Sequence, residues 1–372
     1  MNDSYELHRL ALAPLLRPND SDVLRASLDC ISGHNSQQFV EFVVQQGLGP
    51  LWHQKLQLHN ATSLIPDALI RLLASAHREA AAHYLLQKAT LRDLRSHLDD
   101  AGLVHLVYKG VANRERLYSK SALRPAADID LLVAPSDRDK AIGVLIAAGF
   151  VLHVKPANVS HEVNLQRGAA TVDLHWDILR PGRTRVPMVE QLLASRVDAG
   201  DHWRVDDAGA LYIALVHPVF AKYATAPQST LIRVVDLLRL LKDESAADRA
   251  MQLAERSGVA TAAWIMLRWL QRLIGDDVDA IKELTALEHR SAPPALKRRY
   301  LDYWVTKNLA TQLSGAPAIT QAMFTLAAHD TIFDALRALR GAVQAGVERQ
   351  SATQILSRQC TPDTNRLQGA KP

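Results

Sequence analysis

Three aspartates are the residues of this chain best suited to chemistry. Asp128 and Asp130 stand two apart in Asp-Ile-Asp, and Asp173 follows in Thr171-Val-Asp-Leu-His-Trp176. Side chains two apart on a strand share a face, and Asp173 joins the pair if its strand lies alongside. Three carboxylates at one point repel each other unless a cation lies between them. Because oxygen-only clusters suit Mg²⁺, which usually serves substrate phosphates, the pattern predicts a phosphoryl- or nucleotidyl-transfer site.

The residues around Asp130 favour a functional role for this pair. Aspartate is depleted in strands, and Ile129, Leu131 and Leu132 predict a buried central strand. An unpaired carboxylate is costly in such a strand. The alternative is an edge strand that uses charge for solubility.

Upstream, Lys109-Gly110 lies at a predicted strand-to-helix turn. Gly110 would let a phosphate approach the backbone at a helix N-terminus, and Lys109 would add positive charge. An ordinary turn with an exposed lysine is the alternative, because short motifs often match by chance. Arg124 either clamps a phosphate, orients Asp130 through a bidentate bond, or is a surface arginine.

Several other polar residues are candidates for the same site. His175 shares a strand face with Asp173 and could bind phosphate, transfer a proton or orient Asp173, or it is a structural histidine. His217 and Asp236 interrupt apolar helical stretches, and we expect them to pair as a buried polar contact. Two further candidate phosphate contacts are Lys222 and Arg233.

Composition describes an ordinary globular protein. The chain has 372 residues, of which 48% are hydrophobic and 22% charged. Its two cysteines, Cys30 and Cys360, have no metal-ligand spacing, so we expect neither a disulfide framework nor a zinc–cysteine site. The start lacks a secretory pattern and no apolar run is long enough to span a bilayer, which favours a cytoplasmic protein. The net charge of +4 is compatible with a nucleic-acid partner and equally with a mixed-charge surface.

Hydrophobic periodicity divides the chain into four parts. We expect a helical region over residues 1–100, a mixed α/β (α+β) core over 101–205, a second helical region over 206–348 and a flexible tail over 349–372. The expected strands are residues 103–108, 129–133, 150–154 and a hairpin over 163–176 that turns at Gly168. The expected helices include one capped by Asp20 or Ser21, then 37–46, one or two over 66–98, 111–118, 136–148, 208–223 and 230–241.

The motifs resemble a known family. The chain is similar to the uncharacterised nucleotidyltransferase family of the DNA polymerase β-like superfamily in Leu106-Val-Tyr-Lys-Gly110, Arg124-Pro-Ala-Ala-Asp-Ile-Asp-Leu-Leu-Val133, Gly149-Phe150 and Val172-Asp-Leu-His-Trp176. The Lys-Gly and Arg-x-x-x-Asp-Ile-Asp pattern is also similar to AbiEii-type toxin nucleotidyltransferases. The resemblance covers roughly residues 25–245.

This resemblance implies a minimal nucleotidyltransferase fold, a mixed-sheet core flanked by helices. It implies two Mg²⁺ ions, for which Mn²⁺ could substitute, and transfer of NMP from an NTP such as ATP to an acceptor hydroxyl or phosphate, with release of pyrophosphate. The implied metal-binding and catalytic residues are Asp128, Asp130 and Asp173, and the implied nucleotide contacts are Lys109, Gly110, Arg124 and His175. The acceptor, a small molecule, a peptide or RNA, stays open.

Two departures from these relatives keep other functions open. Lys109-Gly110-Val111 stands where the superfamily usually has Gly-Ser, and Ala126 stands where toxin relatives often carry serine. The alternatives are a tRNA-directed, toxin-like nucleotidyltransferase and a degenerate nucleotide-binding or interaction protein without turnover.

Overall fold

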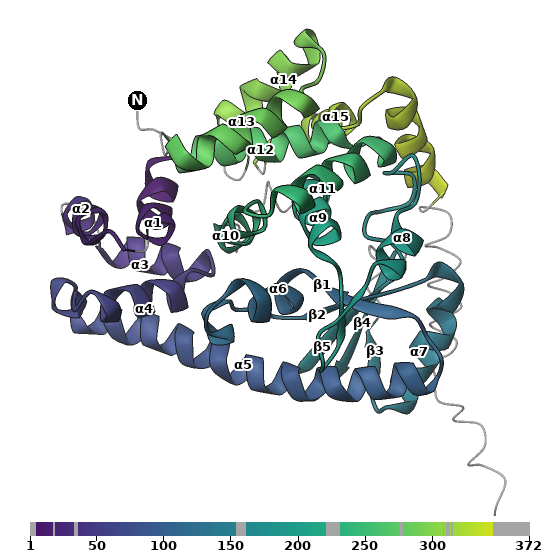
Figure 1. Ribbon diagram of the computed structural model, residues 1–372, viewed down its shortest axis with the longest axis horizontal. Helices are drawn as coiled ribbons and strands as arrows, with labels where there is room; N and C mark the ends of the chain where they lie inside the picture. Colours follow the sequence, from purple (N-terminus) through teal and green to yellow (C-terminus); the bar gives the residue numbers. More distant parts are fainter. Residues whose placement is uncertain are drawn as a thin grey trace, which may run out of the picture.

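The computed structural model describes residues 5–17, 19–32, 36–153, 161–220, 231–275, 278–307, 309, 313 and 315–344. Lys222 and the expected tail over 349–372 lie outside these residues. The described chain has the predicted mixed architecture, with helices flanking one seven-stranded sheet (Figure 1). Among the described residues, no helix combines the length and apolar character needed to cross a membrane.

The N-terminal part is helical, as expected. Its helices are α1 (Glu6–Leu16), α2 (Ser21–Ser32), α3 (Ser36–Gln45), α4 (Gly49–Leu58), the 3₁₀ turn η1 (Thr62–Leu64) and α5 (Asp67–Asp100). Asp20 caps α2, because its Oδ1 accepts hydrogen bonds from the backbone N–H groups of Asp22 and Val23 at 3.0 Å. The segment expected to form one or two helices is a single helix, α5, which runs along the lower side of the molecule in Figure 1.

The central part contains the sheet. Its strands are β1 (His105–Tyr108), β2 (Ile129–Val133), β3 (Val151–His153), β4 (Glu162–Arg167), β5 (Ala170–His175), β6 (Val197–Asp198) and β7 (Trp203–Arg204), in the order β3-β4-β5-β2-β1-β7-β6. The β4–β5 hairpin turns at Gly168, whose φ of 58° suits glycine, as predicted. The short β6–β7 ladder was not predicted, because two-residue strands leave no periodic signal.

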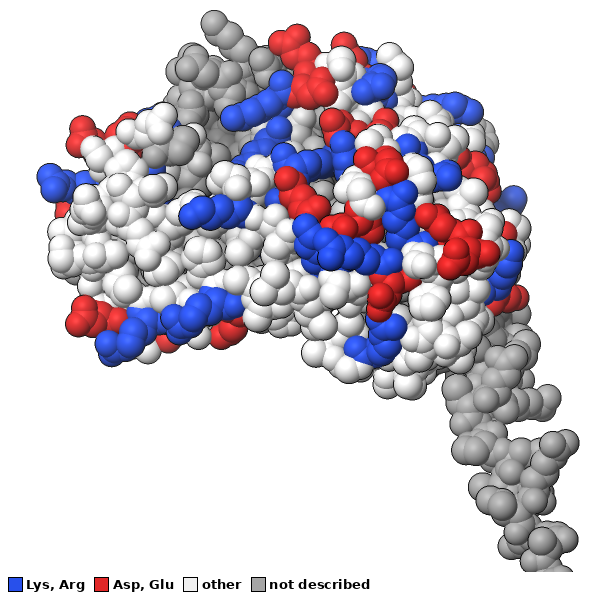
Figure 2. Space-filling model, turned by 60° about the horizontal axis from the view of Figure 1, so that its bottom comes forward, with Lys and Arg blue, Asp and Glu red and all other residues white. Residues whose placement is uncertain are grey.

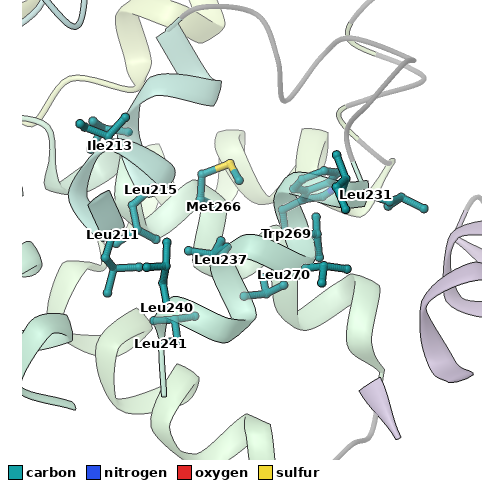
Figure 3. Packing of buried hydrophobic residues seen from close by; sticks show 14 of the residues in the cluster. Leu211, Ile213, Leu215, Leu231, Leu237, Leu240, Leu241, Met266, Trp269 and Leu270 are labelled. Carbon is teal, nitrogen blue, oxygen red and sulfur yellow. The ribbon is translucent and has the colours of Figure 1, made fainter. Parts of the chain in front are cut away.

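Helices surround this sheet and continue beyond it. Those next to the strands are α6 (Lys109–Leu117), η2 (Ser121–Leu123), η3 (Pro135–Asp137), α7 (Arg138–Ala147) and α8 (Val189–Ala194). The C-terminal helices are α9 (Asp207–Phe220), α10 (Leu231–Leu240), α11 (Glu244–Ser257), α12 (Ala260–Ile274), α13 (Val278–Ser291), α14 (Ala295–Thr306) and α15 (Ala318–Ala327), with residues 332–344 also helical. Figure 3 shows apolar side chains of α9, α10 and α12 packed together.

The two faces of the sheet belong to two hydrophobic clusters. Ile129, Leu131 and Val133 pack with Leu94 and Leu98 of α5 on one face. Leu132 points to the other face and joins the cluster formed by the helical regions. Since side chains alternate along a strand, Asp130 shares the face of Leu132 and is directed toward the helical regions. The pleat thus places a carboxylate between sheet and helices.

The exterior carries mixed charge. In Figure 2, Lys and Arg side chains lie among Asp and Glu side chains on the face that is turned forward, without a separate basic stripe. Ion pairs such as Arg92–Asp201 and Arg95–Asp198, both at 2.6 Å, join α5 to the β6–β7 end of the sheet. This face therefore shows the mixed-charge surface that the composition allowed.

Candidate functional site

Two of the three predicted aspartates lie side by side on neighbouring strands. β2 and β5 run parallel, and their register pairs Asp130 with Asp173. The expectation that the strand of Asp173 lies beside the Asp128-Ile-Asp130 segment is therefore confirmed. Asp128 immediately precedes β2 and is half-buried. The fold thus brings the acidic residues to one region of the sheet.

Asp130 is buried between a lysine and a histidine. Its Oδ1 accepts a hydrogen bond from Lys109 Nζ at 2.7 Å and lies 3.1 Å from His175 Nε2. Burial alone would raise the pKa of Asp130, but these two neighbours outweigh burial and hold the pKa well below its usual range. Asp130 is therefore ionised at neutral pH.

The backbone at Lys109 directs this lysine toward the site. Tyr108 ends β1 opposite Asp130 in the antiparallel β1–β2 ladder, and Lys109 begins α6 directly afterwards. Lys109 has a φ of 57°, in the left-handed region that costs a non-glycine residue roughly 1–3 kcal/mol. Such strain persists where the surrounding structure requires it. Here the left-handed backbone at Lys109 accompanies the ion pair between its side chain and Asp130.

The other two aspartates are held differently. Asp173 Oδ1 accepts a hydrogen bond of 2.6 Å from Asn164 Nδ2, across the β4–β5 pair. Burial, together with the charges of Asp130 and Asp173, raises the pKa of Asp128 to about 6. Among the described residues, one group of ligand atoms within 4.8 Å of each other comes from Asp130, Asp173 and His175, and Asp128 stands outside it. Carboxylate oxygens of this kind fit a hard divalent cation.

Arg124 does not orient Asp130. Its Nε and Nη2 atoms donate to Asp236 Oδ2 at 3.1 and 2.7 Å, and Nη1 donates to the carbonyl of Pro125. The bidentate bond with Asp130, one of the three alternatives for Arg124, is therefore wrong, and the guanidinium binds Asp236 of α10 instead. Gly110 makes this path possible, because a Cβ at Gly110 would lie 2.4 Å from Arg124 Nη1. A side chain at residue 110 would therefore displace the Arg124 guanidinium from its present position.

Asp236 is a structural carboxylate with several donors. Besides Arg124, Tyr118 Oη donates to it at 2.7 Å and Asn113 Nδ2 at 3.2 Å. His217 is not among its hydrogen-bond partners, so the expected His217–Asp236 contact is corrected. The donors to Asp236 come instead from α6 and from the segment before β2.

His175 is buried behind the carboxylates rather than open to a phosphate. Its side chain is 1% exposed, and its ring packs edge-on against Tyr108 with centroids 5.4 Å apart. Its Nε2 contacts Asp130, whereas the sequence suggested Asp173 as the carboxylate it would orient. The parallel register explains this, because residue 175 lies opposite Leu132, two positions beyond the Asp130–Asp173 pair.

A pocket opens beside Lys109, between the sheet region and the C-terminal helices. It measures about 660 Å³ including its open mouth. The residues that line it are Lys109, Asn113, Arg124, Ala210, Ile213, Ala214, His217, Pro218, Arg233, Val234, Asp236, Met266 and Trp269. Met266 and Trp269 of its apolar wall belong to the packed helices in Figure 3. The pocket therefore combines a largely apolar wall with the cationic side chains of Lys109, Arg124 and Arg233.

Sequence reasoning missed part of this site. Asn164 and Glu162 alternate on β4 and face Asp173 and His175 across the hairpin. The hairpin predicted over 163–176 with its turn at Gly168 contains Asn164 opposite Asp173, so Asn164 could be detected, whereas Glu162 lies one residue before that hairpin. Trp269 was not detectable, because nothing in the sequence of α12 distinguishes a pocket wall from a core.

Comparison with known proteins gives two matches. A family model described as "uncharacterised nucleotidyltransferase" matches residues 32–275. The chain is also 35% identical over 77 residues to an adenine phosphoribosyltransferase of Alkaliphilus metalliredigens (strain QYMF). That match covers 18% of this chain and 45% of the relative, so the chain spans less than half the relative's length. A match of this extent does not assign the relative's activity.

Proposed function

We propose, from the premise that this chain belongs to the uncharacterised nucleotidyltransferase family, that it transfers an NMP from an NTP to an acceptor in a Mg²⁺-dependent reaction. The observation that supports this best is the pairing of Asp130 with Asp173 on parallel strands, with Asp128 close enough for its pKa to rise. Among these groups, Lys109 is the cation in direct contact with Asp130. The acidic excess fits a divalent cation.

The donor set suits the proposed metal. Asp128, Asp130 and Asp173 would hold Mg²⁺ through carboxylate oxygens, the ligands that this ion prefers. When bound, the metal would neutralise charge on the transferring phosphoryl group and activate the acceptor oxygen. Asn164 fixes one oxygen of Asp173, which leaves its carboxylate oriented to accept a proton from an acceptor hydroxyl.

Phosphate binding is proposed for the start of α6. The free N–H groups of a helix N-terminus attract anions, and Lys109 adds a full positive charge there. Lys109 also lines the apolar pocket, so a phosphate bound by this lysine would lie at the pocket mouth. We propose that the pocket takes an uncharged part of a substrate, either the nucleoside or the acceptor.

Arg124 and His175 enter the proposal with indirect roles. Arg124 lines the pocket, but Asp236 already occupies its guanidinium, so it would shape the site more than bind phosphate. His175 would act through Asp130, whose Oδ1 it contacts. Lys109 and the backbone of Gly110 are the nucleotide contacts that the geometry favours.

The test is Asp130→Asn with pyrophosphate release as the readout. All four NTPs are assayed, and we expect turnover of the NTP that the wild type accepts to fall about a hundredfold, because the variant removes a charge needed in the transition state. Asp139→Asn, an exposed aspartate on α7, is the matched control and should keep full turnover. Unchanged turnover in Asp130→Asn would refute the mechanism.

Assays with different classes of acceptor separate the proposed activity from the tRNA-directed and the non-catalytic alternatives. Incubation with labelled NTPs and total RNA would label RNA if the chain acts like the toxin nucleotidyltransferases. Binding of Mg²⁺–NTP in calorimetry without pyrophosphate release, across RNA, peptide and small-molecule acceptors, would favour the non-catalytic alternative.

A further inference from the structure

A second group of metal-ligating side chains lies next to the carboxylates. Glu162 opens β4 opposite His175, which closes β5, and His161 directly precedes Glu162. His175 Nδ1 lies 3.2 Å from Glu162 Oε2, and His161 Nε2 lies 3.6 Å from the same oxygen. One ligand atom from each residue lies within 4.8 Å of the other two. The two histidines are buried and Glu162 is half-buried.

The protonation of His175 follows from its contact with Asp130. An ionised carboxylate accepts hydrogen bonds and cannot donate, so His175 Nε2 carries the proton at this 3.1 Å contact. In a neutral ring, Nδ1 then presents a lone pair. This atom is buried and has no hydrogen-bond partner in the structure. The lone pair faces Glu162.

Two acceptor atoms 3.2 Å apart repel unless a proton or a metal cation lies between them. Glu162 Oε2 and His175 Nδ1 are in that position. A ring nitrogen of His161 is the third candidate ligand atom, since it lies within 4.8 Å of the ligand atoms of Glu162 and His175. His175 Nδ1, which is buried and lacks a hydrogen-bond partner, is a candidate contact for an ion or a water.

The two separations measured from Glu162 Oε2 are close to those of a tetrahedral coordination sphere, and the two histidine nitrogens lie within 4.8 Å of each other. Metal–ligand bonds of about 2.0–2.1 Å at tetrahedral angles separate the ligand atoms by about 3.3–3.4 Å. The observed separations from Glu162 Oε2, 3.2 and 3.6 Å, bracket this value. Two imidazoles and one carboxylate suit Zn²⁺ or Co²⁺, whereas Mg²⁺ prefers oxygen ligands alone.

We propose that His161, Glu162 and His175 form a binding site for a zinc-class divalent cation, distinct from the carboxylate site of the proposed function. A metal-bound histidine usually donates its other ring N–H to a carboxylate, which is the arrangement of His175 with Asp130. The bound ion fixes the ring of His175 and, through it, the orientation of Asp130. His175 is thus a positioning residue that connects the two sites.

The test is titration of the metal-stripped full chain with Co²⁺, read by visible absorption. We expect one equivalent of Co²⁺ to give the intense bands of tetrahedral coordination and Zn²⁺ to bleach them. His161→Ala and Glu162→Ala should each weaken Co²⁺ binding more than tenfold. Circular dichroism of each variant shows that the fold is retained.

Two controls make the assignment specific. Asp128→Asn should leave the Co²⁺ spectrum unchanged, since Asp128 belongs to the carboxylate site. His77→Ala removes another close histidine pair, in which His53 Nδ1 and His77 Nδ1 lie 3.1 Å apart, and should also leave the spectrum unchanged. Absence of tetrahedral bands, or bands that persist in His161→Ala and disappear in His77→Ala, would overturn the proposal.

This test does not depend on turnover. A chain that binds Co²⁺ through His161 but releases no pyrophosphate supports the zinc-class site and refutes the proposed activity. A chain that releases pyrophosphate and gives no tetrahedral spectrum does the reverse.

Discussion

Two buried aspartates in this molecule illustrate opposite uses of a carboxylate. Asp236 on α10 receives hydrogen bonds from Arg124, Tyr118 and Asn113, and it has a cation of its own. Asp130 on β2 has Lys109 as its cation but lies in register with a second aspartate, Asp173. The first carboxylate is fully satisfied within the protein. The second belongs to a group with excess negative charge, which is the condition that a ligand cation relieves.

The largest expected effect concerns the satisfied aspartate. Asp236→Asn leaves the Arg124 guanidinium buried without its counter-charge, and losing one partner of a buried pair costs about 3–5 kcal/mol. Asp173→Asn removes charge from a repulsive group and should change the free energy of unfolding by less than about 1 kcal/mol. Urea denaturation of both variants measures the difference. Equal losses in the free energy of unfolding would contradict the distinction between a satisfied carboxylate at Asp236 and a repulsive group at Asp173.

The next effect concerns the unsatisfied group. Mg²⁺ should stabilise the wild-type chain by about 2.7 kcal/mol at a concentration one hundred times its Kd, because it binds only the folded protein. Asp128→Asn should lose most of this gain, and Asp139→Asn, the exposed control, should keep it. Thermal denaturation with and without Mg²⁺ gives the measurement. A Tm increase of the same size in all three proteins would place the ion elsewhere.

The smallest effect is a pH dependence. The pKa of Asp128 is raised to about 6 by burial and by its acidic neighbours, above its ordinary value of 3.8. The folded state therefore binds more protons than the unfolded state between these values, and this group's contribution to stability rises as pH falls from about 6 to about 4.

Asp128→Asn abolishes that contribution. We take the free energy of unfolding of the variant minus that of the wild type at each pH. This difference should be larger at pH 7 than at pH 4.5, by on the order of 1 kcal/mol after solvent screening. Denaturation of both proteins across this pH range measures the difference. Groups that titrate alike in the two proteins do not contribute to it. A difference that does not vary with pH would show that Asp128 is neither buried nor close to the other carboxylates in solution.

The sequence predicted the strands of the site better than its contacts. Alternating apolar residues located β2, and Gly168 located the β4–β5 turn, because both signals are local. The partner of Arg124 could not be predicted, since Asp236 lies more than a hundred residues away in the sequence. Asp130 and Asp236 can each accept a bidentate hydrogen bond from a guanidinium. Choosing between them requires the positions of α6 and α10.

The single long helix α5 has a consequence for dissecting this protein. Its 34 residues extend about 51 Å at 1.5 Å per residue, and its last turns place Leu91, Leu94 and Leu98 in the hydrophobic cluster of the sheet. A fragment that begins at residue 101 would expose that apolar face of the strands to water. A fragment expected to fold around the aspartates therefore begins before Leu91, so any expression library or domain fusion built on this chain should keep the last turns of α5.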